Sequence, residues 1–183
     1  MKIYETYPAE GDFDQIELID KDVLDFFDMF DTELPLSKEW ILVKLRCVHP
    51  RSSRKRPLRS DFPNLSGHPM ALRQKSVDAL RQILDRHAEA LPLDDENGEG
   101  IFAIHVLTVI DALDREASKV VCFSGTNRIM DIEKHVFKSE LLNGVDMFRL
   151  PDQSAQTFVS QNFVDAVQKA GLVGLDFKLL WEG

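Results

Sequence analysis

The sequence predicts an α+β fold with a mostly antiparallel sheet, two or three helices, and a C-terminal helix followed by a strand. Short apolar runs separated by turn residues recur along the chain, which is typical of strands joined by hairpins. Apolar residues at helical spacing occur in only a few segments. No internal repeat or low-complexity tract divides the chain, so we expect a single domain over residues 1–183.

The first third of the chain predicts a strand, a helix and a second strand. Lys2–Tyr7 alternates weakly, which suggests an opening edge strand. In Lys21–Thr32, Val23 and three phenylalanines fall on one helical face and aspartates on the opposite face, which predicts an amphipathic helix. Trp40–Val48 then has the pattern of a strand.

The middle of the chain predicts an exposed connection and then the strongest helix. Pro50–Pro69 is rich in proline, serine and arginine, as surface connections are. Pro69 suits the first position of a helix that runs to about Arg86. The apolar face of this helix consists of Val77, Leu80, Ile83 and Leu84.

Two hairpins and a further pair of strands should follow this helix. The polar turn Asp94–Gly100 separates Leu91–Leu93 from Ile101–Ile110, whose apolar residues on both faces are typical of a central strand. Lys119–Ser124 should pair with Arg128–Phe137 across a short turn. The remaining short strands are Met147–Leu150 and Gln156–Val159.

The last quarter of the chain predicts a helix and a strand that form one unit. Ser160 suits the N-cap of a helix, and Gly171 can adopt the left-handed conformation that ends it. The helical face between them consists of Phe163, Val164 and Val167. Every second residue after Gly174 is large and apolar, so one strand face should enter the core. These residues are Leu175, Phe177, Leu179 and Trp181.

The charge of the chain is unevenly distributed. The net charge is -9, and Met1–Glu33 contains eleven acidic residues against two lysines. Lys44–Arg59 contains seven basic residues and no acid. This basic segment has no aromatic residue on which bases could stack, and the whole chain is acidic. We therefore expect no nucleic acid ligand.

The sequence also predicts a cytoplasmic protein without a membrane partner. The N-terminal residues lack the apolar core of a signal peptide, and the longest uncharged apolar run is about half a membrane span. Cys47 and Cys122 each lie in a strand-like run, where we expect buried, reduced thiols.

His105 is the strongest candidate for catalysis, but the pattern around it favours a structural role. It lies within an apolar strand, where a histidine is more often a hydrogen-bonded core residue than a base. Either Asp111 or Asp114 could act with it in a small hydrolase or an enzymatic antidote. However, aspartates at the end of a strand usually accept bonds from nearby backbone amides. We expect no catalytic residue.

Metal and cofactor sites are not indicated either. Cys47, His49 and Cys122 lack the spacing of zinc ligands. The serines near glycines at Ser66–Pro69 and Phe123–Thr126 match neither a nucleophile elbow nor a phosphate-binding loop. We therefore expect no metal and no cofactor.

Two charged segments are candidates for binding a protein partner. The acidic face of the N-terminal helix is either a solvated surface or one that covers the basic cleft of a nuclease or similar toxin. Its residues are Asp22, Asp25, Asp28 and Asp31. The basic segment is either a solvated loop or a docking site for an acidic protein surface. The candidate contact residues within it are Arg51, Arg54, Lys55 and Arg56.

Several motifs together resemble a known family. They are Ser60–Pro63, the helix after Pro69, Leu91–Leu93, Asp111–Asp114, Met147–Leu150, Phe158–Ser160 and the ending Gly171–Trp181, with the pattern Gly-Leu-x-Gly-x-x-Phe-x-x-x-Trp. From about Trp40 onward the chain resembles a bacterial polymorphic-toxin immunity family, and the first forty residues resemble it loosely. The resemblance implies a single α+β domain that is encoded beside a toxin and protects the producing cell by binding that toxin. The alternatives are the enzymatic antidote and a regulatory module that dimerises.

Overall fold

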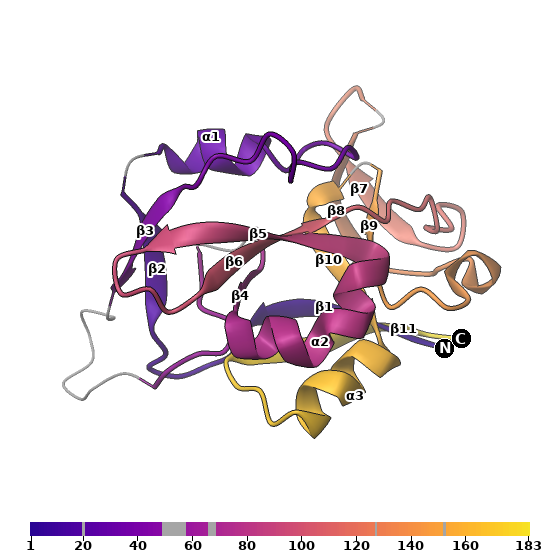
Figure 1. Cartoon of the computed structure of the whole chain (residues 1–183). Helices are drawn as coiled ribbons and strands as arrows, with labels where there is room; N and C mark the ends of the chain where they lie inside the picture. The colour runs from indigo at the N-terminus through magenta and orange to yellow at the C-terminus, as the bar shows by residue number, and fades with distance from the viewer. Residues whose placement is uncertain (20, 49–57, 66–68, 127, 152) are drawn as a thin grey trace.

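The computed structural model describes residues 1–19, 21–48, 58–65, 69–126, 128–151 and 153–183 (Figure 1). The helices in these residues are α1 (Val23–Asp28), α2 (Gln74–His87) and α3 (Gln161–Lys169). The strands are β1 (Lys2–Pro8), β2 (Gln15–Leu18), β3 (Lys44–Val48), β4 (Ala71–Arg73), β5 (Ala88–Asp95), β6 (Ile101–Val106), β7 (Lys119–Cys122), β8 (Ile129–Lys134), β9 (Met147–Leu150), β10 (Gln153–Ser160) and β11 (Leu175–Glu182). The predicted α+β class and the C-terminal helix followed by a strand are confirmed.

The strands form three sheets. Five strands pair in the order β2-β3-β5-β6-β4, four pair in the order β11-β1-β10-β9, and β7 and β8 form a separate hairpin. All these pairs are antiparallel except β3 with β5. Strand β1 lies between β10 and β11, and the two chain ends lie side by side (Figure 1). The prediction of an edge strand is therefore wrong, because the last strand of the chain pairs with the first, which local alternation cannot show.

The five-stranded sheet is covered on both faces. The chain from α1 to β3 lies on one face and α2 on the other (Figure 1). Strand β6 is buried on both faces, as predicted for a central strand. Its residues Ile101 and Ala103 belong to the core under α1, whereas Ile104 and Val106 belong to the core that α2 shares with α3.

Several element boundaries differ from the predicted ones. The prediction that a helix begins at Pro69 is wrong, because Ala71–Arg73 pairs with β6 as β4 and α2 begins at Gln74. Helix α1 has six residues and is shorter than predicted, and β3 begins at Lys44. Sheet pairing with distant segments overrides local propensity at these places. The β5–β6 and β7–β8 hairpins are confirmed. The two short strands predicted after them are confirmed as β9 and β10, which pair with each other.

The C-terminal unit, which we define as β10, α3 and β11, forms as predicted except at one side chain. The Ser160 hydroxyl accepts the Phe163 amide at 3.4 Å, and Gly171 follows α3 with a φ of +60°. The prediction that Leu179 enters the core is wrong, since it is 46 % exposed. A register shift in the pairing of β1 with β11 accompanies this change, and the neighbouring Leu180 packs against the core.

Candidate functional surface

Residues 22–42 form an outer layer over the five-stranded sheet, which we call the acidic cover (Figure 1). It consists of α1 and the chain that leads from α1 to β3. Asp22 caps α1 by accepting the Leu24 amide at 2.8 Å. Phe26 and Phe30 of the cover point toward the sheet and are fully buried. The inner side of the acidic cover is therefore part of the hydrophobic core.

Aromatic packing attaches the far end of the acidic cover to α1 and to the sheet. The centroid of the Trp40 ring lies 6.4 Å from that of Phe26 and 6.0 Å from that of Phe30. The indole N–H of Trp40 donates to the Pro92 carbonyl of β5 at 2.7 Å. Trp40 thus adds its ring to the core while its polar atom remains hydrogen-bonded.

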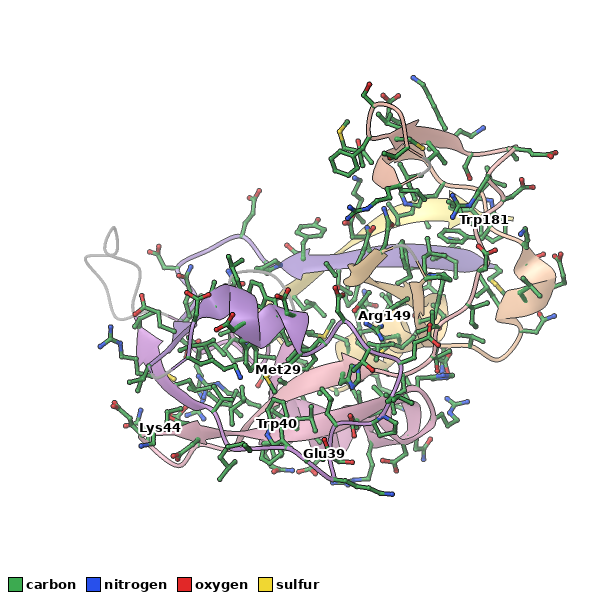
Figure 2. All side chains as sticks on the ribbon, turned by 90° about the horizontal axis from the view of Figure 1, so that it is seen from above. Met29, Glu39, Trp40, Lys44, Arg149 and Trp181 are labelled. Carbon is green, nitrogen blue, oxygen red and sulfur yellow. The ribbon has the colours of Figure 1, made fainter. Side chains whose placement is uncertain are left out.

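Three side chains beneath the acidic cover bind its backbone, and we call them the latch: Arg149, His105 and Glu89. Arg149 is 3 % exposed and donates to the carbonyls of Phe30 at 2.8 Å and Thr32 at 2.7 Å. Figure 2 shows the molecule from above, and Arg149 lies to the right of Met29 and Trp40 in this view. Burial lowers the pKa of Arg149, and the nearby charge of Asp31 counteracts this.

His105 and Glu89 continue the latch toward the middle of the acidic cover. His105 is 1 % exposed; its Nε2 donates to the Thr32 carbonyl and its Nδ1 lies next to Glu89 Oε1, both at 2.9 Å. The Glu89 carboxylate also accepts the amides of Leu36 at 2.5 Å and Ser37 at 3.1 Å. Burial acts to raise the pKa of Glu89, but the hydrogen bonds outweigh it and lower this pKa. Glu89 is therefore an ionised acceptor inside the protein.

The outer side of the acidic cover is exposed and negatively charged. Asp22, Asp25, Asp28 and Asp31 are all exposed, as the amphipathic pattern predicts. None of them forms an ion pair with a cation in the described ranges. Residues 22–42 contain six acids and one lysine. A partner that approaches this surface therefore meets a predominantly negative potential.

The family model described as "Immunity protein family (Imm11)" matches residues 86–180. The chain belongs to the Imm11 immunity protein family. The matched range of this Imm11 member contains all three latch residues, whereas the acidic cover lies outside it. No curated protein matches the chain. None of the helices in the described ranges has the length and apolar character of a membrane span.

The enzymatic alternative does not find its predicted geometry in this Imm11 member. The two ring nitrogens of His105 contact the Thr32 carbonyl and Glu89, and neither Asp111 nor Asp114 is a partner of this ring. Asp114 accepts two backbone amides of its own turn, at 3.0 and 3.1 Å, which confirms the turn interpretation. His105 is the hydrogen-bonded core residue that its apolar strand predicts.

The other predicted residues lie elsewhere. Arg51, Arg54, Lys55 and Arg56 fall outside the described residues, and their role stays a prediction. Cys47 in β3 is half-buried, and Cys122 in β7 is exposed; both are free. The expectation of a buried Cys122 is wrong, because this residue lies at the end of β7 next to the exposed Phe123, outside the part of the hairpin that packs into the core. Among the described residues, no three His, Cys, Asp or Glu side chains are grouped so that they could hold a metal ion.

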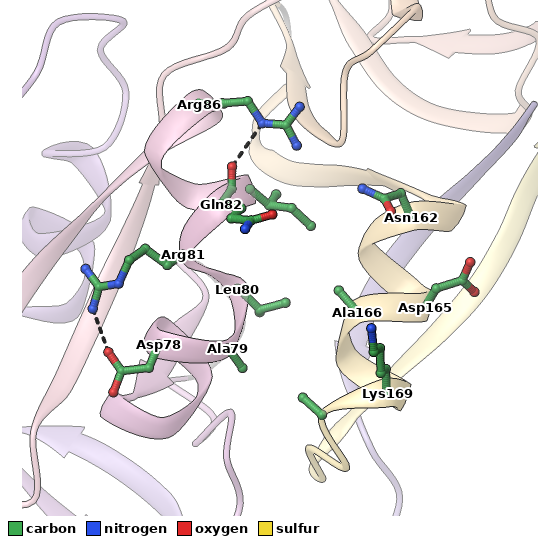
Figure 3. Close-up of a pocket in the computed structure, with 12 residues that line it drawn as sticks. Asp78, Ala79, Leu80, Arg81, Gln82, Arg86, Asn162, Asp165, Ala166 and Lys169 are labelled. Atoms are coloured by element: carbon green, nitrogen blue, oxygen red, sulfur yellow. Dashed lines mark hydrogen bonds and ion pairs between the residues drawn. The ribbon is translucent and has the colours of Figure 1, made fainter.

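A groove between α2 and α3 is the second surface feature of this Imm11 member. It has a volume of about 680 Å³ and is open to solvent (Figure 3). Arg81 on its rim forms an ion pair with Asp78 at 2.6 Å, and Lys169 lies near Asp165 on the opposite helix. Because these charges are mixed, the groove lacks the one-sided potential of the acidic cover.

Sequence reasoning misses two of the three latch residues, Arg149 and Glu89. The available signal is a charged residue inside an apolar strand: Arg149 stands between Phe148 and Leu150. A buried charge requires hydrogen-bonded partners, so such a residue indicates a polar contact with another segment. The pattern does not show which segment that is.

Proposed function

We propose that this Imm11 member is a cytoplasmic immunity protein that binds a cognate toxin encoded beside it and blocks that toxin without catalysis. Family membership supports the immunity role. The acidic cover supports a contact surface, because its exposed aspartates lie on a backbone that the latch holds in place. A surface that is already ordered loses little conformational entropy when it binds.

The sign of the acidic cover favours a toxin whose active surface is basic. Toxins that act on nucleic acids or other phosphate-bearing substrates need positive charge where those substrates bind. A concentration of exposed aspartates accelerates encounter with such a surface and orients it, and like charges repel the wrong partners. Steric coverage of the toxin's substrate site then completes the inhibition.

The first experiment is co-expression of this chain with the protein encoded next to its gene, scoring host survival and complex formation. We expect survival and a one-to-one complex. Protection at far lower ratios of this chain to toxin would favour an enzymatic antidote instead. Host death together with no complex would overturn the proposed function.

Charge reversal then tests the acidic cover itself. The triple variant Asp25→Lys, Asp28→Lys, Asp31→Lys leaves the Asp22 cap in place and should weaken toxin binding at least about tenfold at low salt. Its matched control reverses three exposed acids elsewhere, with the same change in net charge: Asp85→Lys, Glu116→Lys and Glu140→Lys. Equal affinities of the two triple variants for the toxin would show that the acidic cover does not contribute to toxin binding.

A further inference from the structure

The three most exposed large apolar side chains of the described residues all belong to the acidic cover. Ile41 is 78 % exposed, Leu34 73 % and Leu24 67 %. Single exposed apolar residues are ordinary on protein surfaces. Here the three highest values fall within one outer layer of 21 residues, which already differs from the remaining surface by its charge. We call these three residues the apolar anchors.

Incomplete folding of this layer does not account for their exposure. Residues two positions after two of the anchors belong to the core: Phe26 is fully buried two positions after Leu24, and Val43 is 5 % exposed two positions after Ile41. The backbone between them is held by the latch and by Trp40. The apolar anchors are therefore held outward on a fixed layer, as contact residues on a pre-organised surface are.

The charge around the apolar anchors selects the kind of partner. Six acids against one lysine disfavour nucleic acid and an anionic lipid surface. A symmetric contact between two copies through this layer would place acids opposite acids. The complementary surface belongs to a protein that has an apolar recess within a basic rim.

We infer that the apolar anchors and the acids around them form the contact core for such a protein: Leu24, Leu34 and Ile41 enter its apolar recess, while the acids face its basic rim. This inference rests on the proposed function and identifies the partner surface as that of the toxin. The two kinds of residue act on different rate constants. The acids govern association, which depends on salt, and the apolar anchors govern dissociation.

The test is a kinetic comparison with the protein encoded next to this chain's gene as the immobilised probe. The triple variant Leu24→Ser, Leu34→Ser, Ile41→Ser should dissociate about 10–1000-fold faster, with an association rate constant that changes less than about threefold. The matched control replaces three exposed apolar residues elsewhere, Leu141→Ser, Val173→Ser and Leu179→Ser, and should keep wild-type kinetics. Asp25→Asn, Asp28→Asn, Asp31→Asn should instead slow association and reduce its salt dependence.

The possible outcomes separate this inference from the proposed function. If the wild-type chain binds the probe but the anchor variant dissociates at the wild-type rate, the inference is overturned and the proposed function stands. If the wild-type chain does not bind the probe, both fail. A wild-type dimer that the anchor variant converts to a monomer would identify a second copy as the occupant and overturn the inference. Thermal unfolding checks that the variant folds, and the single variant Leu34→Ser serves if it does not.

Discussion

The acidic cover and the C-terminal unit differ in the interactions that attach them to the rest of the protein. Within the C-terminal unit, apolar residues close in sequence pack against each other, such as Phe163 against Phe177, whose ring centroids lie 6.2 Å apart. Both strands of this unit also pair with β1. The acidic cover is held by its buried rings, Phe26 and Phe30, and also by a latch whose members follow it in the sequence by about fifty residues or more. The family match includes the C-terminal unit almost entirely and excludes the cover.

This difference separates the part of the chain that the family model matches from the contact surface that we propose. Core positions must fill a fixed volume, which restricts the residues that they can hold. Outer positions of the acidic cover have no such restriction, while the latch binds only their backbone. Because backbone carbonyls and amides are the same for any sequence, one latch can support covers with different outer side chains. Such an arrangement lets the surface change without a change of fold.

The strongest test of the comparison is removal of a core ring from the C-terminal unit. Phe163→Ala should lower the free energy of unfolding by about 3–5 kcal/mol, because Phe163 is fully buried and leaves a cavity. Urea unfolding measures this loss. Val173→Ala, at a side chain that is 49 % exposed, is the control and should cost less than about 0.5 kcal/mol. Similar losses for the two variants would contradict the role assigned to apolar packing.

Removal of the latch arginine should loosen the acidic cover selectively. Arg149→Met takes away the charged donor to the carbonyls of Phe30 and Thr32, at a cost of about 2–3 kcal/mol. Hydrogen exchange should accelerate in residues 22–42 more than in α3. Arg81→Met, at an exposed ion pair, should leave both rates unchanged. Uniform acceleration across the chain would mean that the cover does not open on its own.

Glu89 should make the attachment of the acidic cover sensitive to acid. Its pKa is below the ordinary value of 4.5, so its contribution to stability is present above pH 4.5 and is lost as the pH falls through the lowered pKa. At pH 7, Glu89→Gln should cost about 1–3 kcal/mol, since one backbone amide loses its acceptor. The difference between wild type and variant should shrink below pH 4.5. A difference that stays constant with pH would exclude the ionised carboxylate as its source.

His87 should act in a higher pH range and outside the acidic cover. Burial lowers its pKa below 6.5, and Arg86 acts in the same direction. Its Nε2 accepts the Asp146 amide at 3.2 Å, a bond that protonation would remove. The contribution of the neutral ring is therefore complete above pH 6.5 and is lost as the pH falls through the lowered pKa. Unfolding at pH 7.5 and 5.5 should show a smaller decrease for His87→Gln than for wild type, and equal decreases would contradict this assignment.

The sequence predicts the fold class because apolar periodicity is a local property, and the C-terminal unit shows this best. Ser160, Phe163 and Gly171 each determine their own backbone environment with neighbours a few residues away. The acidic face of α1 follows from the same kind of pattern. The failures come from non-local pairing: β1 is internal because β11 reaches it, and Ala71–Arg73 is a strand because β6 lies beside it.

The candidate surface is less predictable than the fold for a related reason. The aspartates of the acidic cover can be read from the sequence. The exposure of Leu24, Leu34 and Ile41 cannot, because it depends on which neighbouring side chains occupy the core. An apolar pattern by itself assigns such residues to the interior. The pairing of Glu89 with His105 and with backbone amides after α1 requires three segments to meet, and a single sequence does not show that meeting.

The smallest expected effect on stability concerns the two cysteines. The reactivity of their thiols compares β3, the strand that follows the acidic cover, with the β7–β8 hairpin. Burial raises the pKa of the Cys47 thiol in β3, so little of it is thiolate, whereas Cys122 is exposed in β7. A thiol reagent should therefore modify one cysteine rapidly in the native protein, none in Cys122→Ser, and the second only after unfolding. Cys122→Ser should change stability by less than about 0.5 kcal/mol. Rapid reaction of both thiols would mean that β3 opens readily, and the acidic cover would then lack the fixed support that the latch and the core give it.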